Sequence, residues 1–239
     1  MPLDGFRTSG DCQLLVPRAS CAQGCAAGSV CVGSDLCAPQ PNAVNVGTLH
    51  VEGLGTKPLE LTPTSPTNLT YQAVPTLPPS ACVEGDAVTA RAATFSLAGK
   101  CVGALALTTA VPVPVTSGHA THLAWTPPGH AGISRVAIVL EISHHGGYKG
   151  EIDCDVADTG AFDIPEPLVT SLVALGRAGY PTVKVVRTSS ATAPEAPGVR
   201  LEIVSRAEVA VDTGIISCGN DATPGCPAGT TCQLDYTCR

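Results

Sequence analysis

Alternation of apolar and polar residues predicts that the central part of the chain, residues 43–214, consists of short β-strands. Successive side chains of a strand point to opposite faces of its sheet, so a half-buried strand shows this period of two. Glycine and proline divide the candidate segments from one another. The expected strands lie at 46–54, 57–63, 68–74, 86–97, 101–109, 122–126, 134–143, 150–156, 181–189 and 199–213.

One segment, residues 165–179, has the pattern of a helix instead. Pro165 and Pro167 stand near its start, and Gly176 and Gly179 stand near its end. A hairpin turn is expected at "AGKC" (98–101), between the strands at 86–97 and 101–109. About ten strands with one short helix predict an all-β fold, a β-sandwich, with a closed barrel as the alternative. Its core should gather around Trp125, Phe95 and Phe162.

A cysteine pattern recurs at the two ends of the chain, as "GCAAGSVCVGSDLC" from Gly24 and "GCPAGTTCQLDYTC" from Gly225. Each copy has one further cysteine upstream, and the two copies predict small cysteine-rich modules at residues 1–42 and 215–239. Four more cysteines stand outside the repeats, which brings the total to an even 12. The repeats hold Cys21, Cys25, Cys31, Cys37, Cys218, Cys226, Cys232 and Cys238, and the others are Cys12, Cys82, Cys101 and Cys154.

Segments of about twenty residues bury too little apolar surface to fold alone, so cross-links must replace a core. Structural zinc is the alternative, but the repeats have five-residue gaps and no histidine, whereas zinc sites favour Cys-x2-Cys pairs or Cys/His sets. We therefore expect disulfides at all twelve cysteines. Three connectivities are possible in each module. Interlaced pairing constrains every segment and is our prediction: Cys21–Cys31 with Cys25–Cys37, and Cys218–Cys232 with Cys226–Cys238.

Composition and charge narrow the possible partners. The net charge is −7 and no run of lysine or arginine occurs, which argues against nucleic acid. No apolar run reaches the length of a membrane-spanning helix. Disulfides form in oxidising compartments, so the cysteines indicate an extracellular or cell-surface protein. Residues 1–12 lack the apolar region of a signal peptide, which leads us to expect that an export leader has been removed.

The arrangement resembles the cysteine-rich secreted proteins and lipoproteins of myxobacteria. Many of these carry a Cys-Pro-x-Gly-x-x-Cys unit, seen here as "CPAGTTC" (226–232) and, without the proline, as "CAAGSVC" (25–31). The stretch from "HLAWTPPG" to "CDVADTGAFDIP" is similar to a β domain of that group. The resemblance implies export and surface exposure, and it brings no catalytic residues.

Three groups of residues suggest site chemistry. Asp158-Thr159-Gly160 and Asp212-Thr213-Gly214 have the signature of aspartic-protease loops, but only 54 residues separate the two aspartates, and Asp-x-Gly is also an ordinary turn. Asp153, Asp155 and Asp158 offer oxygens to calcium, although a solvent-facing acidic strand fits the pattern better.

Histidines form the third group. If residues 122–126 and 134–143 made a hairpin closed near His130, its far ends would bring His119, His122, His144 and His145 together, as ligands for zinc or copper. The alternative is that histidine is simply tolerated in polar loops.

The leading hypothesis is a non-catalytic secreted or surface protein that serves binding, adhesion or assembly. Its partner would be a cell-envelope component, a polysaccharide or a second copy of the chain. No serine-nucleophile turn or phosphate-binding glycine loop is present, so an enzyme is the less favoured class. The alternatives are an extracellular hydrolase with an unrecognised site and a metal-binding module that uses the His119–His145 cluster.

Overall fold

The chain folds almost entirely into β-strands, with one helix among the residues that the structure describes. This computed structural model describes residues 3–17, 21–33, 35–40, 44–55, 57–65, 69–73, 81–143, 149–176, 180–214, 216, 218, 225–233 and 238. The all-β prediction with one short helix is confirmed.

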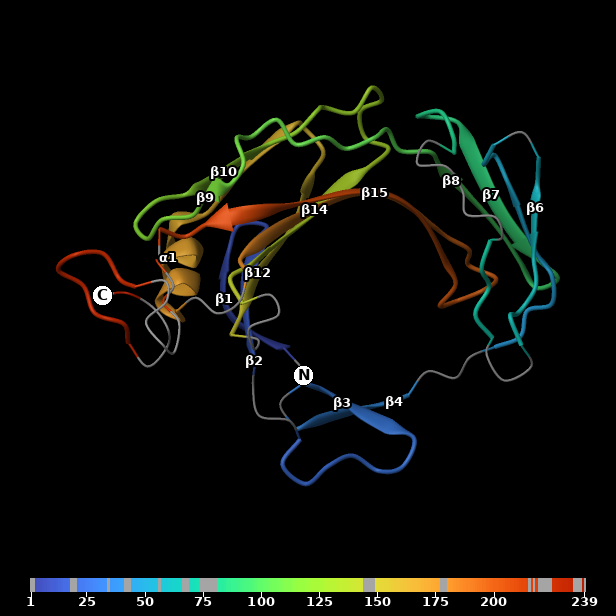
Figure 1. Cartoon of the computed structure of the whole chain (residues 1–239). Helices are drawn as coiled ribbons and strands as arrows, with labels where there is room; N and C mark the ends of the chain where they lie inside the picture. Colours follow the sequence, from blue (N-terminus) through green and yellow to red (C-terminus); the bar gives the residue numbers. More distant parts are fainter. Residues whose placement is uncertain are drawn as a thin grey trace.

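A seven-stranded sheet, curled like half a barrel, organises the molecule (Figure 1). Neighbouring strands are antiparallel, except that the last pair is parallel. Its strands, in order across the sheet, are β1 (Leu3–Ser9), β2 (Cys12–Pro17), β12 (Glu151–Ala157), β11 (Arg135–Glu141), β14 (Thr182–Thr192), β15 (Arg200–Asp212) and β9 (Val113–Pro114).

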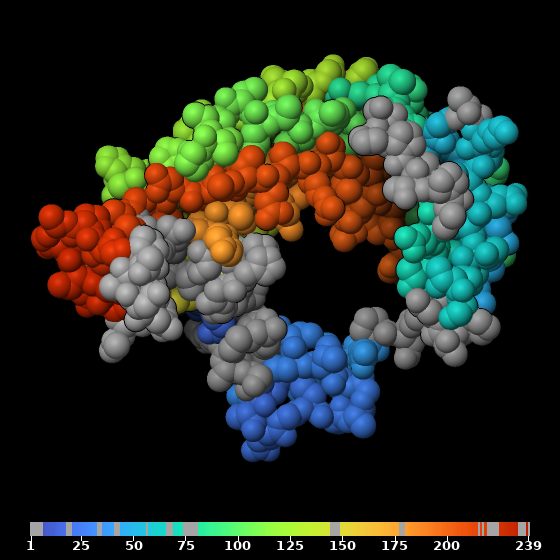
Figure 2. All heavy atoms as spheres, in the orientation of Figure 1, coloured from blue at the N-terminus to red at the C-terminus, as the bar shows by residue number. Residues whose placement is uncertain are grey.

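Three smaller sheets and the helix complete the fold. The helix α1 (Glu166–Ala174) and the strand β10 lie on the outer side of the curled sheet (Figure 1). In the space-filling view, the curled sheet, the four-stranded sheet and the blue hairpin of β3 and β4 surround an opening (Figure 2). The four-stranded sheet has the order β6 (Leu59–Leu61), β5 (Leu49–Glu52), β7 (Ala87–Ala92) and β8 (Phe95–Lys100), and the pairs are β10 (Thr121–Ala124) with β13 (Ala161–Ile164) and β3 (Ser29–Gly33) with β4 (Leu36–Pro39).

The main core lies between one face of the curled sheet and the layer formed by α1, β10 and β13. Alternation selects this face: on β12, for example, Ile152, Cys154 and Val156 are buried and the residues between them are not. Trp125 is buried in this core, as predicted, and Phe162 packs against it. Phe95 is only half-buried and belongs to neither core cluster, so that part of the core prediction is wrong.

A second, smaller core joins the four-stranded sheet to the long strand β15. Val51 and Val88 lie in it, and Leu201 and Ile203 of β15 pack against it. Gly99 on β8 lies at this contact, and a Cβ there would come within 2.6 Å of Ile203 Cδ1, so that side chain would have to shift. The two sheets are therefore packed together through β15.

All twelve cysteines are paired, and the interlaced pairing predicted for both modules is confirmed. The four other cysteines form the bridges Cys12–Cys154 and Cys82–Cys101. The first of these joins β2 to β12 at directly opposite positions. It closes a loop with a sequence separation of 142 and lies in the main core.

Several expected elements differ from the structure. The hairpin between β7 and β8 turns at Ala93 and Thr94, not at "AGKC", and residues 101–109 form no strand, only an isolated bridge at Leu107. Residues 68–74 form no strand among their described positions, only a bridge at Tyr71. Residues 3–17, grouped by the sequence analysis with the N-terminal module, extend the central sheet because β2 pairs with β12.

We predict that the bridge Cys12–Cys154 stabilises the central fold far more than a module bridge does. Replacing both cysteines with alanine should lower the free energy of unfolding by about 2–5 kcal/mol, because the long loop regains its entropy in the unfolded chain. Denaturant unfolding followed by the fluorescence of Trp125, the single tryptophan, measures this. The matched control, Cys226→Ala with Cys238→Ala, should leave that transition in place, and an equal loss in both variants would contradict the prediction.

Candidate functional site

A buried ion pair between Arg187 and Asp158 lies at the centre of the fold. Both side chains are 1% exposed, and Arg187 Nε lies 2.6 Å from Asp158 Oδ2. Arg187 Nη2 donates to Asp158 Oδ1 at 3.1 Å, so the contact is bidentate. Arg187 comes from β14, where alternation places it on the same face as Val183 and Val185.

Every remaining polar atom of this pair has a partner. The Nη2 group of Arg187 also donates to the Thr126 carbonyl at 2.6 Å, and Nη1 donates to the carbonyls of Gly103 and Ala104 at 3.3 Å each. Such complete hydrogen bonding is what makes a buried charge tolerable. The guanidinium therefore holds the loop at 103–104 and the end of β10 against β14.

The carboxylate of Asp158 receives two further hydrogen bonds. Trp125 Nε1 donates to Oδ1 at 2.9 Å, and Ser134 Oγ donates to Oδ2 at 2.7 Å. Burial by itself would raise the pKa of Asp158. The hydrogen bonds from Arg187, Ser134 and Trp125 and the positive charge of Arg187 outweigh burial, and the pKa is lowered.

The two Asp-Thr-Gly segments do not form a protease dyad. Asp158 is enclosed in the ion pair with Arg187, whereas Asp212 is exposed at the end of β15, where Oδ1 accepts from the backbone N–H of Gly214 at 2.8 Å. A shared-proton dyad needs two carboxylates in contact. Asp212 closes a local Asx turn on Gly214, an ordinary use of Asp-x-Gly, and Asp158 lies in the connection between β12 and β13.

The hairpin expected between residues 122–126 and 134–143 is wrong. The strand β10 pairs with β13, and β11 lies in the curled sheet between β12 and β14. His122 Nδ1 lies 2.7 Å from Asp163 Oδ1 on that neighbouring strand, and the backbone of His119 closes a turn on Thr116. His144 and His145 lie outside the described residues, so the four-histidine metal site stays a prediction. The hairpin on which that prediction was based is not formed.

The three aspartates considered for calcium are divided between two places. Asp153 and Asp155 share one face of β12, with Cys154 on the other face, as predicted, but Asp158 turns into the core. In the described part of the chain, the groups of three metal-ligand atoms that meet within 4.8 Å are cysteine sulfurs of the two modules. Those sulfurs are disulfide-bonded.

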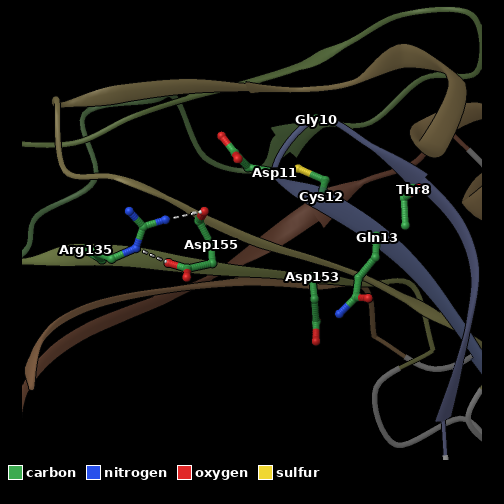
Figure 3. A pocket seen from close by; sticks show the side chains of 8 residues that line it. All are labelled: Thr8, Gly10, Asp11, Cys12, Gln13, Arg135, Asp153 and Asp155. Carbon is green, nitrogen blue, oxygen red and sulfur yellow. Dashed lines mark hydrogen bonds and ion pairs between the residues drawn. The ribbon is translucent and has the colours of Figure 1, made fainter.

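A polar pocket of ≈ 390 Å³ lies on the open face of the curled sheet, where β1, β2, β11 and β12 adjoin (Figure 3). Arg135 is the cation in its lining; Nε donates to Asp155 Oδ1 and Nη2 donates to the Asp155 carbonyl, each at 2.8 Å. Figure 3 shows Gln13 and Asp153 on adjacent strands at the other side of the pocket, in agreement with their register. The lining residues are Thr8, Gly10, Asp11, Cys12, Gln13, Arg135, Asp153 and Asp155.

Asp153 is the least satisfied group of this pocket. Its Oδ1 is buried and has no hydrogen-bond partner among the described residues. Burial raises the pKa of this carboxyl group, and the positive charge of Lys184 opposes the change. Buried acceptors without donors cost stability, and a bound water molecule or ion is one way in which such a group is satisfied.

The sequence analysis did not single out Arg187, Arg135 or Gln13. A signal for Arg187 was present, because the alternation of "TVKVVRTSS" places an arginine on the apolar side of its strand. Gln13 had no comparable signal, since it joins the pocket only through the pairing of β2 with β12.

Comparison of the chain with protein-family models, curated proteins and solved structures finds no match. None of the described residues form a helix with the length and hydrophobicity that a membrane span requires.

We predict that Asp158→Asn destabilises the fold by about 3–5 kcal/mol, because it leaves the buried charge of Arg187 without its counterion. Denaturant unfolding measured at neutral pH gives this difference. The control is Asp163→Asn, at an exposed carboxylate on β13, which should change the stability by about 0.5 kcal/mol or less. Similar losses in the two variants would contradict the structural role of the pair.

The stabilisation from Asp158 should also depend on pH. The pKa of Asp158 is lower in the folded chain than in the unfolded chain, where it is near 3.9, so its contribution is fully present above that value. It is lost as the pH falls through the folded-state pKa, because protonation ends the ion pair. Unfolding of the unsubstituted chain and of Asp158→Asn, compared from about pH 6 to about pH 2, should show a gap that narrows below about pH 4. A constant gap would refute the assignment.

Proposed function

We propose that this protein is a secreted or cell-surface binding protein without catalytic activity, and that it holds a polysaccharide of the cell envelope in the polar pocket between β1–β2 and β11–β12. The observation that carries the proposal is the unpartnered Asp153 oxygen in that pocket. The remaining support comes from the disulfides and from the chemistry of the lining.

The cross-links support the compartment. Six disulfides pair all twelve cysteines, a usage typical of extracellular proteins. The resemblance of the end modules to those of secreted myxobacterial proteins points to the same compartment.

The pocket lining supports a hydroxyl-rich ligand. Asp153, Asp155 and Asp11 accept hydrogen bonds, Gln13 both donates and accepts, and Arg135 donates. Sugar hydroxyls combine a donor and an acceptor on one atom, so neighbouring hydroxyls can meet this mixture. The pocket is open to solvent at the exposed residues Gln13, Arg135 and Asp155, which suits a chain that passes across a surface.

A binding role is favoured over catalysis by how the acidic groups are arranged. The carboxylate with a lowered pKa, Asp158, is enclosed by Arg187, Trp125 and Ser134 and cannot reach a substrate. Asp155 is held by the exposed Arg135. Asp153 is left as a lining carboxylate with one oxygen that no group of the described residues satisfies.

We predict that Asp153→Ala weakens binding to cell-envelope polysaccharide about tenfold, since a ligand hydroxyl loses a charged acceptor. Co-sedimentation with insoluble envelope polysaccharides, over a range of protein concentrations, gives the affinity. Asp163→Ala is the matched control, because it removes the same charge from an exposed position on β13, a strand that does not line the pocket.

Two results would contradict the proposal. One is the absence of binding to every polysaccharide tested, and the other is equal binding by Asp153→Ala and the unsubstituted chain. Reproducible hydrolysis of the polysaccharide, abolished by a single substitution in the pocket, would replace the binding role with an enzymatic one.

A further inference from the structure

The long strand β15 leaves most of one backbone edge open. It pairs with β14 from Arg200 to Ala210, but its other edge pairs with β9 only at Val211 and Asp212, as far as the described residues show. In Figure 2 the orange-red atoms of β15 run along the near side of the molecule. An open edge of this length offers a row of N–H and C=O groups to another strand.

Hydrogen bonds at the end of β15 show which residues face the open edge. The N–H of Val211 donates to Pro181 on the β14 side, and the carbonyl of Asp212 accepts from Val115 on the β9 side. Backbone groups alternate in direction along a strand, so odd-numbered residues bond to β14 and even-numbered residues face outward. The outward groups therefore belong to Arg200, Glu202, Val204, Arg206, Glu208 and Ala210.

These same residues carry a symmetrical charge pattern. Two charged residues stand on each side of Val204, and their signs are reversed across it: Arg200 and Glu202 before, Arg206 and Glu208 after. All of them have exposed side chains on one face of the strand, and Val204 is 53% exposed.

We propose that β15 is an interface between two copies of this chain, which pair antiparallel through their β15 edges around a two-fold axis at Val204. Val204 then lies opposite Val204 of the second copy, Glu202 opposite Arg206, and Arg200 opposite Glu208. Every charged side chain meets one of opposite sign, which stabilises cross-strand pairs. The outward backbone groups of these positions face each other, so each pair exchanges two hydrogen bonds.

Neighbouring registers lack this match. Moving the axis to Ile203 puts Arg200 opposite Arg206, and moving it to Ser205 puts Glu202 opposite Glu208. Like charges placed directly opposite destabilise a pair of strands. The charge pattern therefore selects one register, with a hydrophobic residue at its centre.

Charged residues on edge strands usually prevent pairing between molecules. That protection works when like charges meet, which happens if all the charged residues of the edge have the same sign. Here the alternating signs turn repulsion into attraction for one partner, an antiparallel copy. The strand β9 occupies this edge from Val211 onward. In the proposed register the partner's strand begins with Arg200 opposite Glu208, so it does not collide with β9.

The inference goes beyond the proposed ligand binding to the assembly of two chains. Its test measures oligomeric state alone, so its failure leaves polysaccharide binding unaffected, and the reverse also holds.

Charge reversal tests the register. Arg206→Glu and Glu202→Arg each place two like-charged pairs across the two-fold, so each variant alone should dimerise at least about tenfold more weakly than the unsubstituted chain. Mixing the two variants restores opposite charges at all positions, and the mixture should dimerise again. Sedimentation velocity over a wide concentration series measures this, and added salt should weaken the unsubstituted dimer.

Lys57→Glu, at an exposed loop position, is the control for the change in net charge and should dimerise normally. Circular dichroism of each variant verifies that it is folded. A chain that stays monomeric at every concentration would overturn the proposal, as would a dimer that Arg206→Glu leaves unchanged.

A cross-link tests the two-fold position directly. In a hydrogen-bonded antiparallel pair the Cα atoms lie about 5.5 Å apart, a separation that a disulfide spans. Val204→Cys should therefore form a covalent dimer under mild oxidation. Ser190→Cys, at an exposed position of β14 on the same face, should stay monomeric, and equal cross-linking of both variants would refute the proposed axis.

Discussion

The fold depends on one charge enclosed in its core, the guanidinium of Arg187. Within the described residues it is the one buried residue with a charged side chain, and it contacts groups from three other segments: residues 103–104, Thr126 and Asp158. Taking such a charge out of water costs several kcal/mol unless all its donors are satisfied. The loop carbonyls that accept hydrogen bonds from Arg187 must therefore stay at fixed positions. This requirement explains how the segment from 101 to 109 is ordered without being a strand.

Periodicity located most of the strands because it reports burial on one face. The long strands β11, β12, β14 and β15 lie within one to three residues of their expected ranges, and their core faces follow the alternation. Cysteine spacing was equally informative: within a four-cysteine module, interlacing leaves no segment unconstrained, and both modules are interlaced. Both signals are local, and a sequence displays local constraints directly.

What the sequence did not show is which strands become neighbours. Residues 122–126 and 134–143 are joined by a short loop, yet they lie in different layers. The first segment pairs with β13 in the layer that covers the core, and the second is a strand of the curled sheet on the other side of the core. The bridges Cys12–Cys154 and Cys82–Cys101 depend on such pairing and could not be chosen from spacing. The pocket follows the same rule, because Gln13 and Asp153 meet only where β2 joins β12. The candidate site was therefore the least predictable part of the chain.

The bridge Cys12–Cys154 links this long-range pairing to the pocket. Its sulfurs are buried on the core face, so the residues on either side of each cysteine point to the opposite face. The strand neighbours Gln13, Asp153 and Asp155 supply hydrogen-bond acceptors of the pocket lining. A covalent bond under the sheet thus fixes the spacing of the polar side chains above it. Since ordering side chains is a main cost of binding, a pocket held in place this way loses less free energy when a ligand enters. The same disulfide that stabilises the fold therefore prepares the site.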